Sequence, residues 1–315
     1  MKIVIPGGNG HLGTLLTNHF REAGHQVVIL SRNVEAHAVL WDGKTLGDWA
    51  SVIDGADVVI NLAGRSVDTR YSPAKKAEII QSRVDSTRVV GEAIALAKRP
   101  PRVWLQASTA TIYAHTYGEA NDEYTGVIGG SEPDVPEAWH FSIDVAKAWE
   151  RAVDTADTPH TRRVKLRAAM VMTAERGGAF RLLLRHVRLG FGRFGDGRQY
   201  MSWIHERDFI RAIEWLIDHD LEGAVNLASP NPITNQEFIE ELQQTWGTRV
   251  SVPSVRPLLD IGAFLVRTEL ELVLKSRRVV PGRLLHSGFA FEFPHWSDAA
   301  RDLCSRSRTG AGRIW

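Results

Sequence analysis

Short apolar runs alternate with amphipathic stretches along the first half of the chain. The runs that predict strands are Ile3–Ile5, Val27–Leu30, Val39–Trp41, Val58–Leu62, Val103–Ala107 and Val164–Ala168. Segments with helical periodicity separate most of them, and the clearest of these extends from Ala74 to Ala97. Buried strands that alternate with helices are typical of a parallel sheet covered on both faces. The pattern therefore predicts an α/β fold with a doubly wound parallel sheet.

A glycine-rich turn follows the first predicted strand. Gly7, Gly10 and Gly13 lie three residues apart, and an amphipathic helix and a second strand follow them. Glycines at this spacing allow a tight turn, close approach of the backbone to a pyrophosphate and close packing of the helix on the strand. The phosphates would lie at the helix N-terminus, beside His11 and Leu12. A plain glycine-rich loop is the weaker interpretation, because the βαβ context is complete.

The residues after the second and fourth strands bear on the choice of cofactor. Ser31 and Arg32 end the second strand, where an acidic residue would bind a free ribose 2′-hydroxyl. A hydroxyl and a guanidinium suit a 2′-phosphate instead, so NADP is favoured over NAD. The alternative is that Arg32 merely occupies an exposed strand end. Leu62, Ala63 and Gly64 end the fourth strand and are expected to meet the cofactor at the same sheet edge.

The pattern loosens after Val171. We expect a helix over Phe180–Leu189, a loop over Gly190–Gly197 and a strand over Tyr200–His205. Arg207–His219 and Ala224–Ala228 predict one more helix and strand of the main sheet. We therefore predict two interleaved domains. Residues 1–170, with 205–228 returning to them, form the dinucleotide-binding domain, and residues 171–204 and 229–315 form a smaller substrate-binding lobe.

Composition limits the classes of partner. The chain has 315 residues, of which 43% are hydrophobic, with 38 basic and 37 acidic residues. Nearly cancelled charge gives no field that would favour nucleic acid or an acidic membrane. Cys304 is the sole cysteine, which excludes an internal disulfide and a cysteine-based zinc site. We expect no secretory signal, membrane span or metal site, a cytoplasmic location, a small-molecule substrate, and a monomer or homodimer.

Several segments resemble a known family. They include the glycine turn, Asn61–Gly64, Ser82–Arg83, Trp149–Glu150, Gly195–Gln199, Ser202–Asp208 and Val279–Pro294. The chain resembles an extended short-chain dehydrogenase/reductase of the atypical, epimerase-like branch (NAD-dependent epimerase/dehydratase) with a C-terminal domain of unknown function. The resemblance covers nearly the whole chain and implies a Rossmann-like fold, with Arg83 beside the cofactor. It also implies an NADP(H)-dependent oxidoreductase or epimerase-like enzyme acting on a small polar, sugar-nucleotide-like substrate.

The resemblance also implies a catalytic set, from which this chain departs. The superfamily uses a Ser or Thr, a Tyr, and a Lys four residues after the Tyr. Thr109 fits the hydroxyl position and Lys147 fits the lysine that also holds the cofactor ribose, but Ile143 stands where the tyrosine is expected. An isoleucine cannot transfer a proton.

Other residues could replace the tyrosine. His140 and Asp144 precede Lys147 on the same expected helix, and His205 faces the cleft by family analogy. A solvated or capping role is the alternative for His140, and a buried structural role is the alternative for His205. The competing function is a non-catalytic NADPH-binding or sensing protein, in which the missing tyrosine marks lost chemistry.

Overall fold

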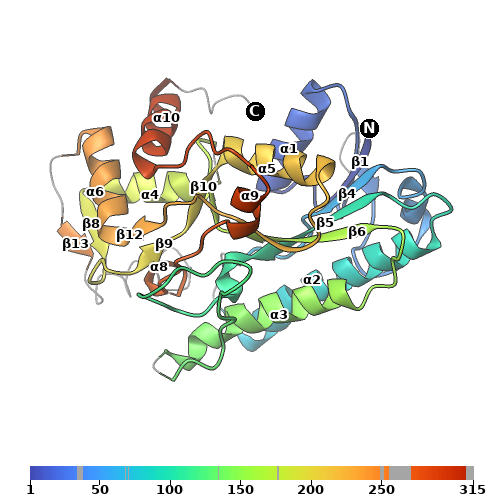
Figure 1. Cartoon of the computed structure of the whole chain (residues 1–315), viewed down its shortest axis with the longest axis horizontal. Helices are drawn as coiled ribbons and strands as arrows, with labels where there is room; N and C mark the ends of the chain where they lie inside the picture. The colour runs from blue at the N-terminus through green and yellow to red at the C-terminus, as the bar shows by residue number, and fades with distance from the viewer. Residues whose placement is uncertain are drawn as a thin grey trace.

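A seven-stranded parallel sheet forms the centre of the molecule (Figure 1). The computed structural model describes residues 1–33, 38–67, 69, 71–133, 135–175, 177–248, 252–254 and 271–309. The strand order is β11-β6-β5-β4-β1-β2-β3, and each neighbouring pair is parallel. The strands are β1 Lys2–Pro6, β2 Gln26–Ser31, β3 Ala38–Leu40, β4 Val58–Asn61, β5 Val103–Thr109, β6 Arg162–Ala168 and β11 Gly223–Leu227. The predicted doubly wound parallel sheet is confirmed.

Helices cover both faces of this sheet. Ile3 and Ile5 of β1 pack in one core with residues of α1 (His11–Glu22) and α5 (Glu206–Asp218). Val4, between them, packs on the other face with residues of α2 (Pro73–Leu96). Helix α3 (His140–Asp154) lies beside α2, and Figure 1 shows this pair on the opposite side of the sheet from α1 and α5. Because both faces are buried, the strands are apolar at consecutive positions.

A second lobe has its own hydrophobic core at the end of the molecule away from β2 and β3 (Figure 1). Its described elements are β7 Met170–Met172, α4 Ala179–Arg188, β8 Phe191–Phe194, β9 Tyr200–Met201, β10 Trp203–His205, β12 Ile233–Thr234, α6 Asn235–Trp246, β13 Val252–Ser254, α8 Glu271–Leu274 and α10 Trp296–Thr309. The expected loop at Gly190–Gly197 is partly wrong, because it contains β8. The expected strand at Tyr200–His205 is two strands in different sheets, separated at Ser202.

The C-terminal part of the chain belongs to both cores. Phe293, Trp296 and Cys304 pack in the core of the second lobe. Leu284 of α9 (Gly282–His286) and Phe289 instead pack in the sheet core, on the α1–α5 face. These two side chains therefore pack outside the lobe to which the prediction for 229–315 assigns them. The returning segment 205–228 supplies α5 and β11 to the sheet domain.

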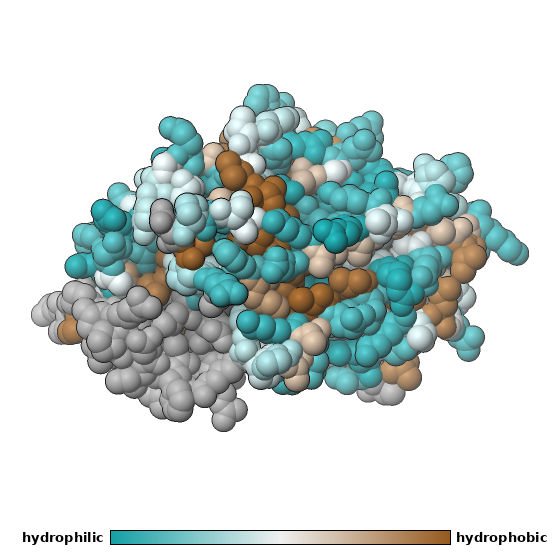
Figure 2. All heavy atoms as spheres, turned by 90° about the horizontal axis from the view of Figure 1, so that it is seen from below, coloured by the Kyte–Doolittle hydropathy of each residue, from teal (hydrophilic) through white to brown (hydrophobic). Residues whose placement is uncertain are grey.

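One face of the molecule carries mostly hydrophilic side chains (Figure 2). Figure 2, which looks at the molecule from below the view of Figure 1, shows a mainly hydrophilic face on which hydrophobic side chains gather in small patches. Within the described ranges, no helix combines the length and the apolar character needed to cross a bilayer.

Candidate active site

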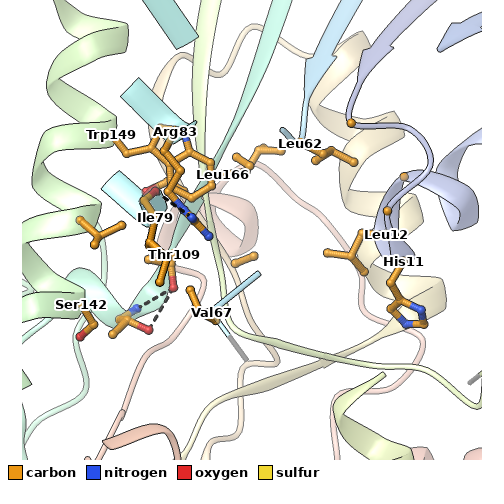
Figure 3. A pocket seen from close by; sticks show the side chains of 18 of the residues that line it. His11, Leu12, Leu62, Val67, Ile79, Arg83, Thr109, Ser142, Trp149 and Leu166 are labelled. Atoms are coloured by element: carbon orange, nitrogen blue, oxygen red, sulfur yellow. Dashed lines mark hydrogen bonds between the residues drawn. The ribbon is translucent and has the colours of Figure 1, made fainter. Parts of the chain in front are cut away.

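A cavity of about 370 Å³ opens at the carboxyl ends of β1, β4, β5 and β6. The glycine turn after β1 forms one wall, and α2 and α3 form the opposite wall (Figure 3). Ligands of open α/β sheets bind at this edge. The predicted site residues that line it are Gly7, Gly10, His11, Leu12, Gly13, Leu62, Arg83 and Thr109.

The glycine turn leaves no room for a side chain at two of its positions. Gly7 has a φ of +79°, and a Cβ there would lie 2.8 Å from the backbone nitrogen of Ala63. A Cβ on Gly13 would lie 2.6 Å from the carbonyl oxygen of Gly7. Gly10 differs, because the nearest atom to its Cβ would be that same oxygen at 3.3 Å and the residue lines the cavity. A ligand can therefore approach the backbone closely at Gly10.

The N-terminus of α1 meets the cavity without a capping side chain. Gly10 is the N-cap, and the fully described helix has no acidic residue in its first turn. Amide groups without a cap and the positive end of the helix dipole favour an anion. His11 places Nε2 2.7 Å from the Thr173 hydroxyl, and burial lowers the pKa of its imidazole while the Glu175 charge opposes this. The residues present fit the pyrophosphate of a dinucleotide.

The end of β2 leaves Arg32 exposed beside the glycine turn. The hydroxyl of Ser31 is buried and accepts hydrogen bonds from Asn9 Nδ2 at 2.9 Å and from the amide of Asn33 at 3.1 Å. Ser31 thus anchors the turn to the strand end. Neither residue lines the cavity itself.

The end of β4 shapes the cavity without lining it beyond Leu62. The amide of Ala63 donates to Asn61 Oδ1 at 3.0 Å, which fixes the backbone against the glycine turn. A Cβ on Gly64 would lie 3.2 Å from the guanidinium carbon of Arg83. Gly64 therefore makes room for the arginine side chain.

Thr109 ends β5 with its hydroxyl at the cavity. This hydroxyl donates to Thr111 Oγ1 at 3.0 Å and accepts from the Thr111 amide at 3.2 Å (Figure 3). The neighbouring Ser108 hydroxyl donates to Glu150 Oε1 at 2.7 Å. The strand end therefore offers a fixed hydroxyl to a ligand at Thr109.

A buried ion pair sets the rotation of α3. Arg167 of β6 donates to both carboxylate oxygens of Glu150, each at 2.8 Å. Glu150 is buried, so α3 is held with this side toward the sheet. Residues seven positions apart share a helix face, which places Ile143 on the Glu150 side. The residues of α3 that line the cavity are Phe141, Ser142, Val145 and Trp149.

Lys147 and Ile143 therefore do not face the cavity. A Cβ on Gly130 would lie 3.0 Å from Lys147 Nζ, and a Cβ on Gly129 would lie 2.8 Å from Ile143 Cδ1. Both side chains point to the loop that contains these glycines. The expected pair is out of phase with the cavity-facing residues, and the role of Lys147 in catalysis and in holding the ribose stays a prediction.

Arg83 supplies a cation to the cavity from α2 instead. Its Nη1 donates to the carbonyls of Arg65 at 2.9 Å and Ile79 at 3.1 Å. Its guanidinium lies 4.9 Å from the ring centroid of Trp149, and Figure 3 shows it reaching into the cavity between the walls. Burial lowers its pKa to about 10. A charge held in this way favours an anionic or polar ligand group.

Comparisons with known proteins agree with this geometry. The sequence profile of the NAD dependent epimerase/dehydratase family matches residues 3–228. The chain belongs to this family. A domain of unknown function, DUF1731, matches residues 258–303. The family resemblance inferred from the sequence is confirmed, including the C-terminal domain.

Relatives in the family match along almost their whole length. The epimerase family protein YfhF of Bacillus subtilis is 30% identical over 324 residues, which cover 98% of this chain and 100% of that protein. The human epimerase family protein SDR39U1 is 28% identical over 308 residues, covering 96% and 99%.

Two solved structures are also similar to this chain. The crystal structure of human SDR39U1 (isoform 2) with NADPH has a TM-score of 0.83 and 26% identity, and the match covers 97% of this chain and 99% of that one. The nucleoside-diphosphate sugar epimerase of Corynebacterium glutamicum has a TM-score of 0.75 and 26% identity, and the match covers 97% of this chain and 58% of that one.

His205, the third predicted catalytic residue, does not line the cavity. Its side chain is 0% exposed and stacks on Phe293 with ring centroids 3.8 Å apart. Nδ1 accepts from the Arg207 amide at the start of α5, and Nε2 lies 3.1 Å from Asp302. Burial lowers the pKa of this imidazole to about 4, although Asp302 opposes the shift. These contacts are those of a buried structural histidine, and its catalytic role stays a prediction.

The other suggested proton donors also lie away from the cavity. Neither His140 nor Asp144 lines it, and Asp144 is exposed. Sequence reasoning missed the apolar and aromatic part of the cavity wall. Its members include Val67, Tyr71, Ile79, Phe141, Val145, Trp149, Leu166 and Phe209. The apolar residues at helical spacing in α3 were the available signal. The same pattern is equally typical of a helix face buried in a hydrophobic core.

Proposed function

We propose that this chain binds NADP(H) in the cavity and uses it in an oxidoreductase or epimerase-like reaction on a small polar substrate. One observation carries the proposal: a single cavity joins the uncapped N-terminus of α1 to the hydroxyl of Thr109. The first is suited to phosphate and the second to a reacting oxygen. The NADPH in the structure of human SDR39U1 supports the phosphorylated cofactor.

The residues divide the task of holding the cofactor. The turn from Gly7 to Gly13 would receive the pyrophosphate, and Arg32 would pair with the 2′-phosphate. When bound, the cofactor supplies or accepts a hydride. Thr109 would then orient the substrate oxygen by a hydrogen bond, while the apolar wall excludes water from the reacting groups. The match to a nucleoside-diphosphate sugar epimerase supports a sugar-nucleotide-like substrate.

Titration calorimetry with NADPH and NADH tests the cofactor assignment. We expect NADPH to bind more tightly, and Arg32→Ala to weaken NADPH by roughly ten- to a hundredfold, because a charge-assisted contact contributes about 1.5–3 kcal/mol. NADH affinity should hardly change. Arg21→Ala, at another exposed arginine, is the control. Equal affinity of the parent protein for both cofactors would contradict the proposal.

A non-catalytic NADPH-binding protein is the second candidate, and one observation favours it. Among the described residues of α3, those facing the cavity carry neither a phenol nor an amine. NADPH oxidation measured against a panel of carbonyl compounds and sugar nucleotides separates the two functions. Turnover of any member supports the enzyme, whereas tight NADPH binding without turnover across the panel supports the non-catalytic protein.

A further inference from the structure

A tyrosine that precedes α2 lines the cavity although α3 contributes none. Tyr71 is partly exposed and lies on the wall formed by α2 and α3. Its ring packs edge-on against Phe141, with centroids 4.9 Å apart and an interplanar angle of 67°. The contact fixes the phenol beside the first turn of α3. The cavity therefore contains a phenol that the spacing along α3 does not predict.

Burial lowers the pKa of two arginines from different parts of the chain, and the charge of a phenolate at Tyr71 would oppose this effect on both. Arg83 comes from α2, and Arg277 comes from the C-terminal segment. Arg83 also lines the cavity, held over Trp149 as described above. Among the described residues, other charged groups near this end of the cavity include Lys76 (5.0 Å from the Phe141 ring), Glu271 (3.7 Å from Arg277) and Lys275 (3.9 Å from Glu271). Cations near a phenol stabilise its phenolate form.

The ring of Tyr71 packs on Phe141, next to Ser142 in the first turn of α3. Ser142, next to Phe141, donates a hydrogen bond to Glu271, and Lys275 Nζ lies 3.4 Å from the carbonyl of Thr111. Figure 3 shows Ser142 and Thr109 on this side and His11 on the far side, by the glycine turn. Through Phe141, the ring of Tyr71 therefore lies on the Ser142 and Thr109 side of the cavity, where a substrate oxygen would meet Thr109.

We propose that Tyr71 is the proton-transfer residue of this site and that Arg83 is the cation that supports it. The inference rests on the proposed function. In carbonyl reduction, the hydride passes from NADPH to the carbonyl carbon, and the C=O π pair takes the proton of the Tyr71 hydroxyl. The phenolate that remains recovers a proton from water. In alcohol oxidation the same atoms move in reverse, with NADP⁺ as the hydride acceptor.

Other cavity groups suit this step less well. The hydroxyls of Thr109, Thr111 and Ser142 are aliphatic alcohols, which are far weaker acids than a phenol. His11 is bonded to Thr173 beside the glycine turn, at the end suited to phosphate. The phenol of Tyr71 combines the right acidity with the right end of the cavity.

Nuclear magnetic resonance of protein labelled at tyrosine Cζ tests the proposal without a known substrate. The chain has five tyrosines, so the Tyr71 signal can be assigned with Tyr71→Phe. We expect this signal to change to its phenolate form about one pH unit or more lower in the parent protein than in Arg83→Met. Saturating NADP⁺ should shift the Tyr71 signal more than the other four. Tyr124→Phe, at an exposed tyrosine, is the control.

Kinetics provide the second arm. With a carbonyl compound that the parent protein reduces, we expect Tyr71→Phe to lower the rate by about 10²- to 10⁴-fold while NADPH affinity stays within twofold. Tyr124→Phe should keep the parent rate. A Tyr71→Phe rate within threefold of the parent, or a Tyr71 signal indifferent to both Arg83→Met and NADP⁺, overturns this inference and leaves the proposed function standing. NADPH binding without turnover removes the catalytic role together with the enzymatic function.

Discussion

The glycine turn and helix α3 face each other across one cavity, but they contribute different kinds of group to it. The turn contributes backbone, because Gly10 lines the cavity and α1 begins there without a side-chain cap. Helix α3 contributes side chains, chiefly Phe141, Val145 and Trp149. The first wall depends on where glycines lie in the sequence. The second depends on how a helix is rotated about its axis.

This difference decides what each wall reveals in the sequence. A glycine is required wherever backbone approaches backbone, so spacing alone locates the turn. The rotation of α3 is set by Arg167 of strand β6, which donates hydrogen bonds to both carboxylate oxygens of Glu150. No residue pattern within α3 predicts this pairing. The comparison therefore distinguishes a cavity wall that presents backbone groups from one that presents side chains.

The largest expected effect tests whether close backbone packing requires the glycines of the turn after β1. Gly13→Ala would place a methyl group 2.6 Å from the Gly7 carbonyl oxygen and from Gly8 Cα, which rigid backbone cannot avoid. We expect the free energy of unfolding to fall by about 3 kcal/mol and NADPH affinity to fall more than tenfold. Urea unfolding and calorimetry measure the two effects.

Gly10→Ala is the matched variant in the same turn. Its methyl group would lie 3.3 Å from the nearest atom and project toward the cavity. We expect a loss of unfolding free energy below about 1 kcal/mol, but a clear loss of NADPH affinity. If Gly13→Ala proved as stable as Gly10→Ala, the close packing of the turn would be disproved.

The same contrast explains how far sequence reasoning reached. The parallel sheet and the glycine turn were predicted because buried strands and backbone approach leave local patterns in the sequence. The Ile143–Lys147 pair was misplaced because a change of one residue along a helix rotates a side chain by about 100°. Tyr71 was missed because it precedes α2 and reaches the cavity through tertiary packing on Phe141.

The C-terminal segment shows the same limit at the level of domains. Leu284 and Phe289 look like any apolar residues of the second lobe, yet they pack in the sheet core. Arg283 holds this segment in place by donating to the carbonyl of Ala224 in β11 at 2.9 Å. Such a return of the chain requires a partner surface far away in the sequence. Hydrophobic pattern predicts that a residue is buried, but not which core receives it.

A smaller effect, of pH on stability, tests whether His205 acts as a structural group. Its pKa falls from 6.5 to about 4 on folding, chiefly through burial, so the unfolded chain binds more protons between these values. Stability is then complete above pH 6.5 and declines as the pH falls toward 4. We expect His205 to remove about 2 kcal/mol of unfolding free energy between pH 7 and pH 5.

Urea unfolding of His205→Asn at both pH values measures this contribution. The variant should be less stable at pH 7 but should lose less stability on acidification than the parent. His160→Asn replaces an exposed histidine and should keep the parent's pH dependence. NADPH affinity of His205→Asn at pH 7 should stay within about twofold. A large loss of NADPH affinity together with an unchanged pH dependence of stability would contradict the structural role and indicate that His205 acts in the site.

The smallest expected effect concerns Lys147, and it tests the rotation of α3 directly. The side chain lies beside Gly130 and outside the cavity, so its loss removes no contact with a ligand there. We expect Lys147→Ala to change the free energy of unfolding by less than about 0.5 kcal/mol and NADPH affinity by less than about twofold. Arg83→Met is the matched comparison, because it removes a cation that does line the cavity, and it should weaken NADPH more than Lys147→Ala does. A loss of affinity that is tenfold in Lys147→Ala and absent in Arg83→Met would mean that α3 turns its lysine toward the cofactor after all.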